Sequence, residues 1–239
     1  MPKTNANHIQ KDFSAFENAV GVKFKDKALL AQAFTHRSYI NENPGTKLSH
    51  NERLEFLGDA VLELVVTEVL YEKYPNSPEG ELTAYRSALV NAVILSSVAN
   101  DMGMDECLML SRGEARDKGK ARTYILANTF EAYIGALYLD QGYDAASKLI
   151  GRVLLPKTEE IVEKRLWQDA KSLVQEKSQE YFSVTPSYKV IGEAGPDHDK
   201  QFTVAIYFGA DKIAEGKGKS KQEAEQAAAR EAIDKNKWN

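Results

Sequence analysis

The sequence holds one cysteine, Cys107, among its 239 residues. A single cysteine excludes an intramolecular disulfide framework and a zinc site built on several thiolates, and it is typical of a protein that works in a reducing compartment. The sequence also lacks an apolar run long enough to span a bilayer, and its first residues are polar, with no apolar stretch of the signal-peptide kind behind them. We therefore expect a soluble, cytoplasmic protein with no membrane partner.

The sequence also has little net charge, because its acidic and basic residues nearly balance. The net charge is −4, and the small acidic excess is spread over both halves of the chain. Because domains that bind nucleic acid are usually basic, the overall charge weighs against such a partner. Any binding of phosphate must depend on local clusters of basic residues. The length of the chain is compatible with two unequal domains. We expect no small-molecule organic cofactor.

The most informative stretch is NERLEFLGDAVLELVV at residues 51–66. Its apolar residues recur on nearly every side of a helix, a pattern that predicts a buried helix. Yet Glu52, Glu55 and Asp59 are spaced i, i+3 and i+7, which stacks their carboxylates on one face. Clustered carboxylates repel one another and require a compensating cation. Ligands that are all oxygen suit Mg²⁺ or Mn²⁺ better than zinc.

Structural explanations of the same acids remain open at this point. Ser49 and Glu52 fit a capping box, in which Glu52 only closes the helix start. Glu55 is placed to pair with Arg53 or with a more distant base, and a carboxylate stripe is usually a solvated face. Glu63 falls near the same face, so the stripe does not identify which acids work.

A second mostly apolar helix is predicted for residues 123–140. It carries Asn128 and Glu131 one turn apart on a shared face. One glutamate in such a helix fits a buried ion pair. Two helices that each offer oxygen ligands on one side are harder to explain in that way. If the two helices pack together, the sequence predicts one metal pocket lined by Glu55, Asp59, Asn128 and Glu131.

Helical spacing also predicts the elements at the start of the chain. One helix runs from Ile9 to Val20 and is ended by Gly21, and Asp26 is placed to cap the next. His36 follows that second helix. A histidine at a helix end more often holds a loop in place than takes part in catalysis, and we favour the structural interpretation.

The segment between the two acid-bearing helices is predicted from its helix-capping and helix-breaking residues. Ser77 is expected to be an N-cap with Pro78 at the first helical position. The helix that follows is expected to continue towards Gly103. Residues 111–122 are polar and contain two glycines, so we expect a mobile loop or solvated linker there.

At this point the motifs resemble those of ribonuclease III. The stretch NERLEFLGDA at 51–60 matches the signature of that family, and the match continues in THRSY at 35–39, EGELT at 79–83, Arg86 and ILANTFEA at 125–132. The resemblance covers about residues 10–155 in the right order. A run of consecutive matches is far more specific than a charged spacing alone.

The resemblance implies an all-helical endonuclease domain with a catalytic acidic pocket. In family terms, Glu52, Asp59 and Glu131 are expected to be catalytic, and Glu55, Asp59, Asn128 and Glu131 are expected to bind the metal. The family more often has aspartate where this chain has Asn128. An amide oxygen still coordinates Mg²⁺ but adds no charge, which leaves the role of Asn128 open.

The resemblance also implies a two-fold homodimer with one acidic pocket in each protomer. Phe56 matches an aromatic side chain that, in this family, inserts into a pocket of the partner across the dimer axis. Such an isologous contact uses the same surface patch twice.

The last third of the chain changes character. Asp169 fits the N-cap of a helix, and alternating apolar residues predict strands at 187–191, 202–208 and 211–217. The last helix is expected to open at Ser220 in a capping box with Glu223. Its many alanines permit close packing on a sheet. The predicted order is αβββα.

That order resembles a double-stranded-RNA-binding domain over residues 169–235. Lys217, Lys219 and Lys221 surround the N-terminus of the last helix, where free N–H groups and the helix dipole favour phosphate. Without that fold, the lysines would fit a solubilising helix start equally well. The resemblance implies that RNA is contacted by Ser172, Gln175, Glu176 and Gln179 in one minor groove, and by Pro196 and His198 in the next. Gln222 stands where the family often has another lysine.

The sequence therefore predicts a multidomain protein: an all-α endonuclease domain at 8–156, a linker at 157–168 and an α+β (αβββα) RNA-binding domain at 169–237. The expected activity is Mg²⁺-dependent hydrolysis of double-stranded RNA, with Mn²⁺ able to substitute. The resemblance implies 5′-phosphate and 3′-hydroxyl ends with short 3′ overhangs, and processing of ribosomal and other structured RNA precursors.

Two other functions compete with this one. A duplex-RNA binder or ribosome-assembly factor without catalysis has Asn128 as its only support, and the intact acids oppose it. A helical scaffold whose purpose is the dimer face at Phe56 does not explain acids on two helices.

Overall fold

The structure, a computed structural model, describes residues 11–117, 119–165, 167, 169–196 and 200–238. The chain folds as two compact units, Met1–Lys164 and Arg165–Asn239. The described part of the first unit is helical, and the second has the order αβββα. The predicted fold class, a helical domain followed by an α+β domain, is confirmed.

The N-terminal helices form much as the sequence predicts. Gly21 ends α1 (Ser14–Val20) in the left-handed conformation, with φ of 71°. The Asp26 carboxylate accepts a hydrogen bond from the Ala28 N–H and caps α2 (Lys27–Ala33). A third short helix, α3 (Arg37–Glu42), follows. Ile9, the predicted first residue of the helical spacing, lies outside the described residues.

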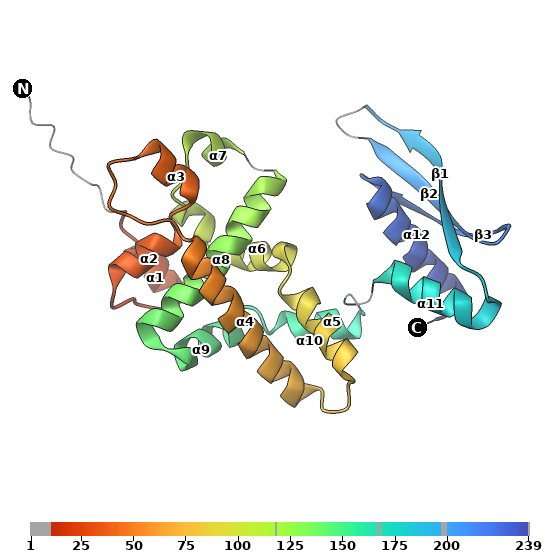
Figure 1. Cartoon of the computed structure of the whole chain (residues 1–239), viewed down its shortest axis with the longest axis horizontal. Coiled ribbons are helices and arrows are strands. Elements are labelled where there is room, and N and C mark those ends of the chain that lie inside the picture. Colours follow the sequence, from red (N-terminus) through yellow and green to blue (C-terminus); the bar gives the residue numbers. More distant parts are fainter. Residues whose placement is uncertain (1–10, 118, 166, 168, 197–199, 239) are drawn as a thin grey trace, which may run out of the picture. The chain divides into compact units, whose positions relative to one another are not determined.

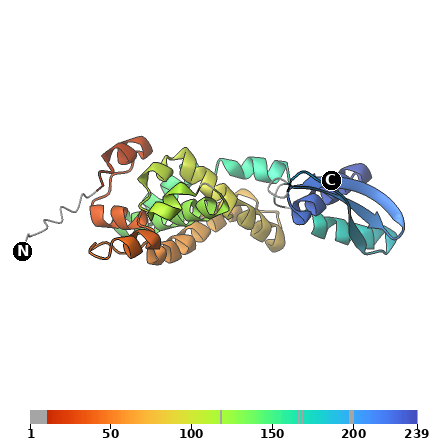
Figure 2. The same ribbon diagram turned by 90° about the horizontal axis from the view of Figure 1, so that it is seen from above.

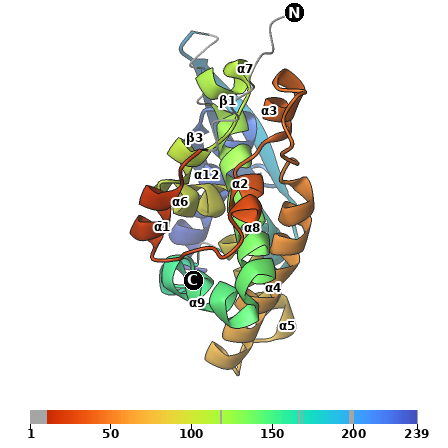
Figure 3. The ribbon, with the colours of Figure 1, turned by 90° about the vertical axis from the view of Figure 1, so that its left-hand side faces the viewer.

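Two long helices form the centre of the first unit. They are α4 (Glu52–Lys73) and α8 (Lys120–Gln141), which pack together more extensively than any other two helices. Figure 3 shows α8 running through the middle of this unit, with α4 on one side and α6 (Ala92–Asp101) on the other. As predicted, α8 is mostly buried; its interior includes Phe130, Tyr133 and Leu137.

Smaller helices surround this pair (Figure 1). They are α5 (Glu79–Leu89), the 3₁₀ helix η1 (Met104–Cys107), α7 (Arg112–Arg116), α9 (Tyr143–Val153) and α10 (Lys157–Glu163), in addition to α6. α9 packs on both α4 and α8. α10 lies within the segment predicted as a linker and packs on α5.

One face of α4 is exposed, which corrects the expectation of a helix buried nearly all round. Phe56, Leu64 and Tyr71 are 83%, 52% and 73% exposed. Their spacing of eight and seven residues is close to two helical turns, so they form one apolar stripe. The opposite face holds the buried residues, among them Leu62 and Val66.

The predicted capping box at the start of α4 is wrong. The helix begins at Glu52, three residues after Ser49, and its N-cap is Asn51 without a side-chain cap hydrogen bond. The Asn51 amide instead donates to the Ala33 carbonyl at 3.1 Å. Asn51 therefore ties the start of α4 to α2, and Glu52 is not needed to close the helix.

The helix expected from Pro78 towards Gly103 begins one residue later and is broken. Pro78 is the N-cap of α5, because its backbone is extended with ψ of 159°. The break comes after Leu89, where the Asn91 carboxamide accepts from the N–H groups of Val93 and Ile94, both at 3.0 Å. Asn91 thus starts α6, which bends by 46° from α5.

The described residues of the segment 111–122, which exclude 118, are more regular than the mobile loop that the sequence predicts. The Ser111 hydroxyl accepts from the Glu114 N–H at 3.2 Å and caps the short helix α7. α8 then begins at Lys120, three residues before the predicted Thr123. The two glycines were interpreted as loop residues. Gly113 instead lies inside α7, and Gly119 is the N-cap of α8.

The second unit has an antiparallel sheet in the order β1-β2-β3, visible as one curved layer in Figure 2. β1 (Pro186–Ala194) is longer than predicted, whereas β2 (Gln201–Phe208) and β3 (Asp211–Gly218) agree closely with the alternating pattern. The helices α11 (Ala170–Phe182) and α12 (Lys221–Asn236) flank the strands in sequence. The Asp169 carboxylate caps α11 and the Ser220 hydroxyl caps α12, both as predicted.

α12 lies unusually close to β3. A Cβ placed on Gly216 would meet the Ala228 nitrogen at 2.0 Å, and one on Gly218 would meet the Ala224 nitrogen at 2.5 Å. Glycine on the strand and alanine on the helix therefore permit contact between the two backbones. The predicted role of the alanines is confirmed.

Candidate functional site

The crossing of α4 and α8 creates the acidic site. A Cβ placed on Gly135 would lie 2.2 Å from the Leu54 carbonyl oxygen, so the two helices touch through their backbones. Glu55 and Asp59 on α4 are thereby brought beside Asn128 and Glu131 on α8. The sequence prediction that the two helices pack together is confirmed.

Glu131 is one of two half-buried acids at the centre of this cluster. Burial raises its pKa to about 7, and the charges of Asp59, Glu55 and Glu63 add to the rise. Three acids of α4 therefore act on one carboxyl group of α8. The contribution of Glu63 agrees with its place near the predicted stripe.

Glu55 is the second half-buried acid. Burial raises the pKa of its carboxyl, and the charges of Glu52 and Asp59 act in the same direction. A polar interaction with the Asn128 side chain opposes the rise. Asn128 therefore favours the ionised form of Glu55, which an aspartate at position 128 would oppose.

Glu52 lies at the edge of the cluster. Its carboxylate accepts from the Arg37 guanidinium at 2.8 Å, and the His50 imidazole lies 3.7 Å away. The Glu52 side chain is 43% exposed, so this pair is accessible to solvent. Asp59 is exposed as well. The four acids thus form a graded site, with Glu131 and Glu55 inside and Asp59 and Glu52 towards solvent.

The donor chemistry of this site fits a hard divalent cation. All its donors are oxygens, and they repel one another in a partly buried place, a repulsion that a cation relieves. As they stand, no three histidine, cysteine, aspartate or glutamate side chains converge into a ready-made metal site within the described part of the chain. The carboxylates are near enough to raise the pKa values of Glu55 and Glu131.

His36 has a structural part, as the sequence suggests. It is the N-cap of α3, and its Nδ1 lies 2.8 Å from the Ser38 hydroxyl. That hydroxyl accepts from the Ser111 N–H at 3.0 Å, which anchors the segment leading into α7. Burial lowers the pKa of His36 and favours the neutral ring.

The second unit gathers the predicted basic residues. Lys217, Lys219 and Lys221 are exposed around the N-terminus of α12. The Glu223 carboxylate accepts from the Lys219 N–H at 2.9 Å, so one negative charge lies among the lysines at the start of this helix. The Lys221 ammonium lies 5.8 Å from the centre of the Phe202 ring.

The other predicted contacts come from α11 and the loop between β1 and β2. Ser172, Gln175, Glu176 and Gln179 are all exposed on α11. Pro196 is exposed in the loop, and His198 lies outside the described residues.

The sequence patterns did not single out Gly58 and Gly135, which set the distance between the acid-bearing helices. A signal was available, because glycine inside a helix costs about 1 kcal/mol relative to alanine and calls for a packing reason.

Within the part of the chain that the structure describes, no single helix is long and apolar enough to cross a membrane; α5 and α6 reach that length only as a bent pair.

Comparison with family models supports both units. Residues 26–158 match a model described as ribonuclease-III-like, and residues 170–236 match the double-stranded RNA binding motif.

Similar proteins match over nearly the whole chain. The chain is 42% identical to Ribonuclease 3 of Bdellovibrio bacteriovorus over 227 residues, which cover 95% of this chain and 97% of that protein. It is 45% identical to Ribonuclease 3 of Streptococcus sanguinis over 212 residues, or 89% and 91%. A solved nuclease domain of ribonuclease III from Campylobacter jejuni, described as flexible in a region involved in dimer formation, is 38% identical with a TM-score of 0.55. That alignment covers 61% of this chain and 97% of the solved domain.

Proposed function

This chain belongs to the ribonuclease III family and is an endoribonuclease, and from that premise we propose that it hydrolyses double-stranded RNA in a reaction that requires Mg²⁺. The observation that carries the proposal is the close crossing of α4 and α8 at Gly58 and Gly135, which brings the acids of α4 near Glu131 and helps to raise its pKa. A group of like charges held together by two crossing helices is costly unless a cation occupies it.

The side chains have distinct parts in this proposal. Glu55, Asp59 and Glu131 would hold the ion, and Asn128 would offer an amide oxygen without charge. A bound cation would favour the ionised form of the Glu131 carboxyl. Glu52, which Arg37 holds at the solvent edge, orients the attacking water. A bound divalent cation neutralises the phosphate and activates water.

The second unit supplies the RNA contact. Lys217, Lys219 and Lys221 meet phosphates at the N-terminus of α12, and the exposed polar face of α11 meets a minor groove. Recognition then follows the shape of the duplex rather than its base sequence. A local cluster of lysines in this unit also explains why the net charge of the whole chain need not be positive.

We further propose a homodimer formed through the apolar stripe of α4. Phe56 is 83% exposed, which is rare for a phenylalanine without a partner. A two-fold contact would cover it on both protomers. Cleavage of both strands by paired sites would leave 5′-phosphate and 3′-hydroxyl ends with short 3′ overhangs.

The remaining parts of the proposal rest on the family resemblance. Mn²⁺ is expected to replace Mg²⁺, because both accept oxygen ligands. The substrates are expected to be ribosomal and other structured RNA precursors. The expected working place is the cytoplasm, where the lone Cys107 stays reduced.

The test compares the wild type with Glu131→Gln on a long RNA duplex in saturating Mg²⁺. We expect the variant to bind duplex RNA as before and to cut it at least about 10²-fold more slowly. Glu72→Gln, an equal change at an exposed site near the other end of α4, is the control and is expected to cut normally. EDTA is expected to stop the wild type. Cutting by Glu131→Gln at the wild-type rate would refute the assignment.

A further inference from the structure

Two ammonium groups lie over one aromatic ring in the second unit. The ring is that of Phe202, near the start of β2, and the Nζ atoms of Lys200 and Lys221 each lie 5.8 Å from its centre. Lys200 comes directly before β2, and Lys221 is the first residue of α12. A cation within about 6 Å of a ring centre is attracted by the negative face of the ring. One side chain therefore gathers lysines from two separate elements.

A carboxylate completes this group of side chains, which we call the Phe202 cluster (Glu193, Lys200, Phe202 and Lys221). Glu193 of β1 is the partner of Phe202 in the sheet, and its carboxylate lies 2.8 Å from the Lys200 ammonium. The hydrogen bond from Lys200 lowers the pKa of the Glu193 carboxyl, and the charge of Lys221 adds to this effect. Two positive charges thus share one negative charge, which leaves a positive excess.

Both lysines of the Phe202 cluster remain open to solvent. The Lys200 side chain is 36% exposed, and Lys221 is exposed as well. A lysine ammonium has three donors, so Lys200 is able to hold Glu193 and to donate to a further acceptor at the same time. The ring and the carboxylate therefore fix the position of the cations without using up their capacity to bind an anion.

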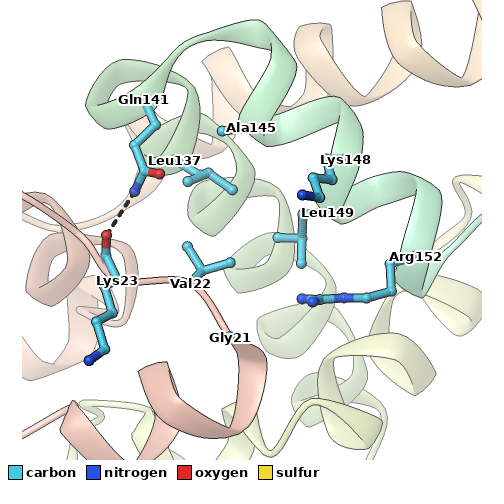
Figure 4. A pocket seen from close by; sticks show the side chains of 9 residues that line it. All are labelled: Gly21, Val22, Lys23, Leu137, Gln141, Ala145, Lys148, Leu149 and Arg152. Carbon is cyan, nitrogen blue, oxygen red and sulfur yellow. Dashed lines mark hydrogen bonds between the residues drawn. The ribbon is translucent and has the colours of Figure 1, made fainter.

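The basic side chains beside the loop that joins α1 to α2 are placed differently (Figure 4). They border a cavity of about 270 Å³ between that loop and α9, whose lining residues Leu137 and Leu149 are 0% and 2% exposed. The Arg152 guanidinium there donates to the Val20 carbonyl. That cavity offers little surface to a ligand, whereas the Phe202 cluster presents two cations to solvent.

The start of α12 has little positive charge of its own. Its first turn holds Lys221 and Glu223, whose charges cancel. The Glu223 carboxylate also accepts from the Lys219 N–H, so it stays close to the helix start. A cation brought from the start of β2 restores a positive excess beside the free N–H groups of the helix, where an anion is favoured.

We propose that Lys200 is a further RNA-binding residue and that Lys200 and Lys221, held by Phe202, bind phosphates of the same RNA backbone. Such a contact carries no sequence information, because it involves phosphate alone. Phe202 is a positioning residue, since it acts through the two lysines. The inference rests on the proposed contact between the second unit and duplex RNA.

The test measures binding of the full-length protein to an RNA duplex longer than the roughly 16 bp that such a domain spans. EDTA is present, so that the proposed Mg²⁺-dependent cleavage is blocked. For Lys200→Gln we expect the affinity near 0.1 M salt to fall roughly five- to tenfold, and the slope of log K against log salt to fall by roughly 1.

Lys212→Gln is the matched control. Lys212 is an exposed lysine of the same sheet and is likewise paired with a glutamate, Glu215. Its variant loses the same charge and the same kind of ion pair outside the Phe202 cluster. It is expected to keep the affinity and the slope of the wild type.

Two more positions separate RNA binding from a structural role. Glu193→Gln removes the negative charge of the cluster and keeps both lysines, so we expect binding to become roughly two- to fivefold tighter. Phe202→Leu removes the ring and is expected to weaken binding about as much as Lys200→Gln does. Phe202→Tyr keeps the ring and is expected to bind like the wild type. The melting temperature of each variant checks that the unit is folded during the measurement.

The proposal is overturned if Lys200→Gln keeps the affinity and the salt slope of the wild type. It is also overturned if Glu193→Gln weakens binding as much as Lys200→Gln does, which is the result expected of an ion pair that only stabilises the fold. In both cases the wild type still binds the duplex, and the RNA contact proposed for the second unit stands. Absence of duplex binding by the wild type would overturn both.

Discussion

Gly58 of α4 and Glu131 of α8 touch through their backbones: a Cβ placed on Gly58 would lie 1.8 Å from the Glu131 carbonyl oxygen. No side chain fits in that space. The contact fixes the depth at which α8 sits against α4, and with it the separation between Glu131 and the acids Glu55 and Asp59. The acidic cluster is therefore a product of helix packing as much as of acidic residues.

Gly58→Ala is expected to force the two helices apart. The added methyl group meets backbone rather than a flexible side chain, so we expect a loss of at least about 2 kcal/mol in the free energy of unfolding. Gly80→Ala is the control, because nothing lies within 4 Å of that position in α5. It is expected to be neutral or slightly stabilising. Urea denaturation measures both, and equal stability of the two variants would contradict the close contact.

The raised pKa of Glu131 predicts a pH dependence of stability without metal. Glu131 loses its proton near 4.5 in the unfolded chain and near 7 in the folded protein. Between these values the folded state binds more protons, so stability falls as the pH rises through that window. The melting temperature in EDTA is expected to decrease from pH 5 to pH 7.5, and less steeply in Glu131→Gln. Parallel pH profiles of wild type and variant would disprove this origin.

Asn128→Asp is expected to exchange stability for metal affinity. The variant replaces the polar interaction that favours ionised Glu55 with another negative charge. Without metal we expect a lower melting temperature at pH 8 than in the wild type, and tighter Mg²⁺ binding by about tenfold. Asn100→Asp, at an exposed position of α6, is the control. Calorimetric titration with Mg²⁺ measures the effect, and weaker binding by Asn128→Asp would contradict it.

Phe56→Ala is expected to weaken the dimer. In a two-fold contact the substitution removes the aromatic side chain from both protomers. We therefore expect the dimer Kd to rise at least about a hundredfold. Tyr71→Ala removes a 73% exposed ring near the other end of the same helix and is expected to change the Kd less. Sedimentation at several concentrations distinguishes the two, and a monomeric wild type would refute the proposed dimer.

Replacing Lys217 and Lys221 by glutamine is expected to weaken duplex RNA binding for all sequences alike. For each lysine that no longer neutralises a phosphate, the slope of log K against log salt is expected to fall by roughly 1. Lys235→Gln, near the opposite end of α12, is the control and is expected to keep the wild-type slope. Filter binding at several salt concentrations measures the slope. No change after both replacements would show that RNA binds elsewhere.

Most of the fold follows from local patterns in the sequence. Asp26, Asp169 and Ser220 each cap a helix as predicted, because a cap depends on residues within one turn. The alternation from Phe202 to Phe208 likewise identified β2. The break at Asn91 was missed because apolar residues continue on both sides of it. Only the competition between an asparagine cap and a continuous helix decides there.

The roles of the site residues stay predictions. The spacing and the family resemblance selected Glu55, Asp59, Asn128 and Glu131, and the structure places Glu131 under the influence of Glu55 and Asp59. The ion pair of Glu52 with Arg37 was not predicted, because it joins residues of two helices whose relative placement depends on the tertiary fold. The cavity beside α9 was missed for the same reason.

The packing of β3 against α12 has a consequence for how the basic segment can vary. Gly216 and Gly218 face the helix and admit no side chain, so Lys217 and Lys219 are left to point outwards. The alternation of glycine and lysine is thus dictated by steric exclusion on one side of the strand. A bulky residue at Gly216 would displace the helix start and disperse the positive charge, although every lysine remained in the chain.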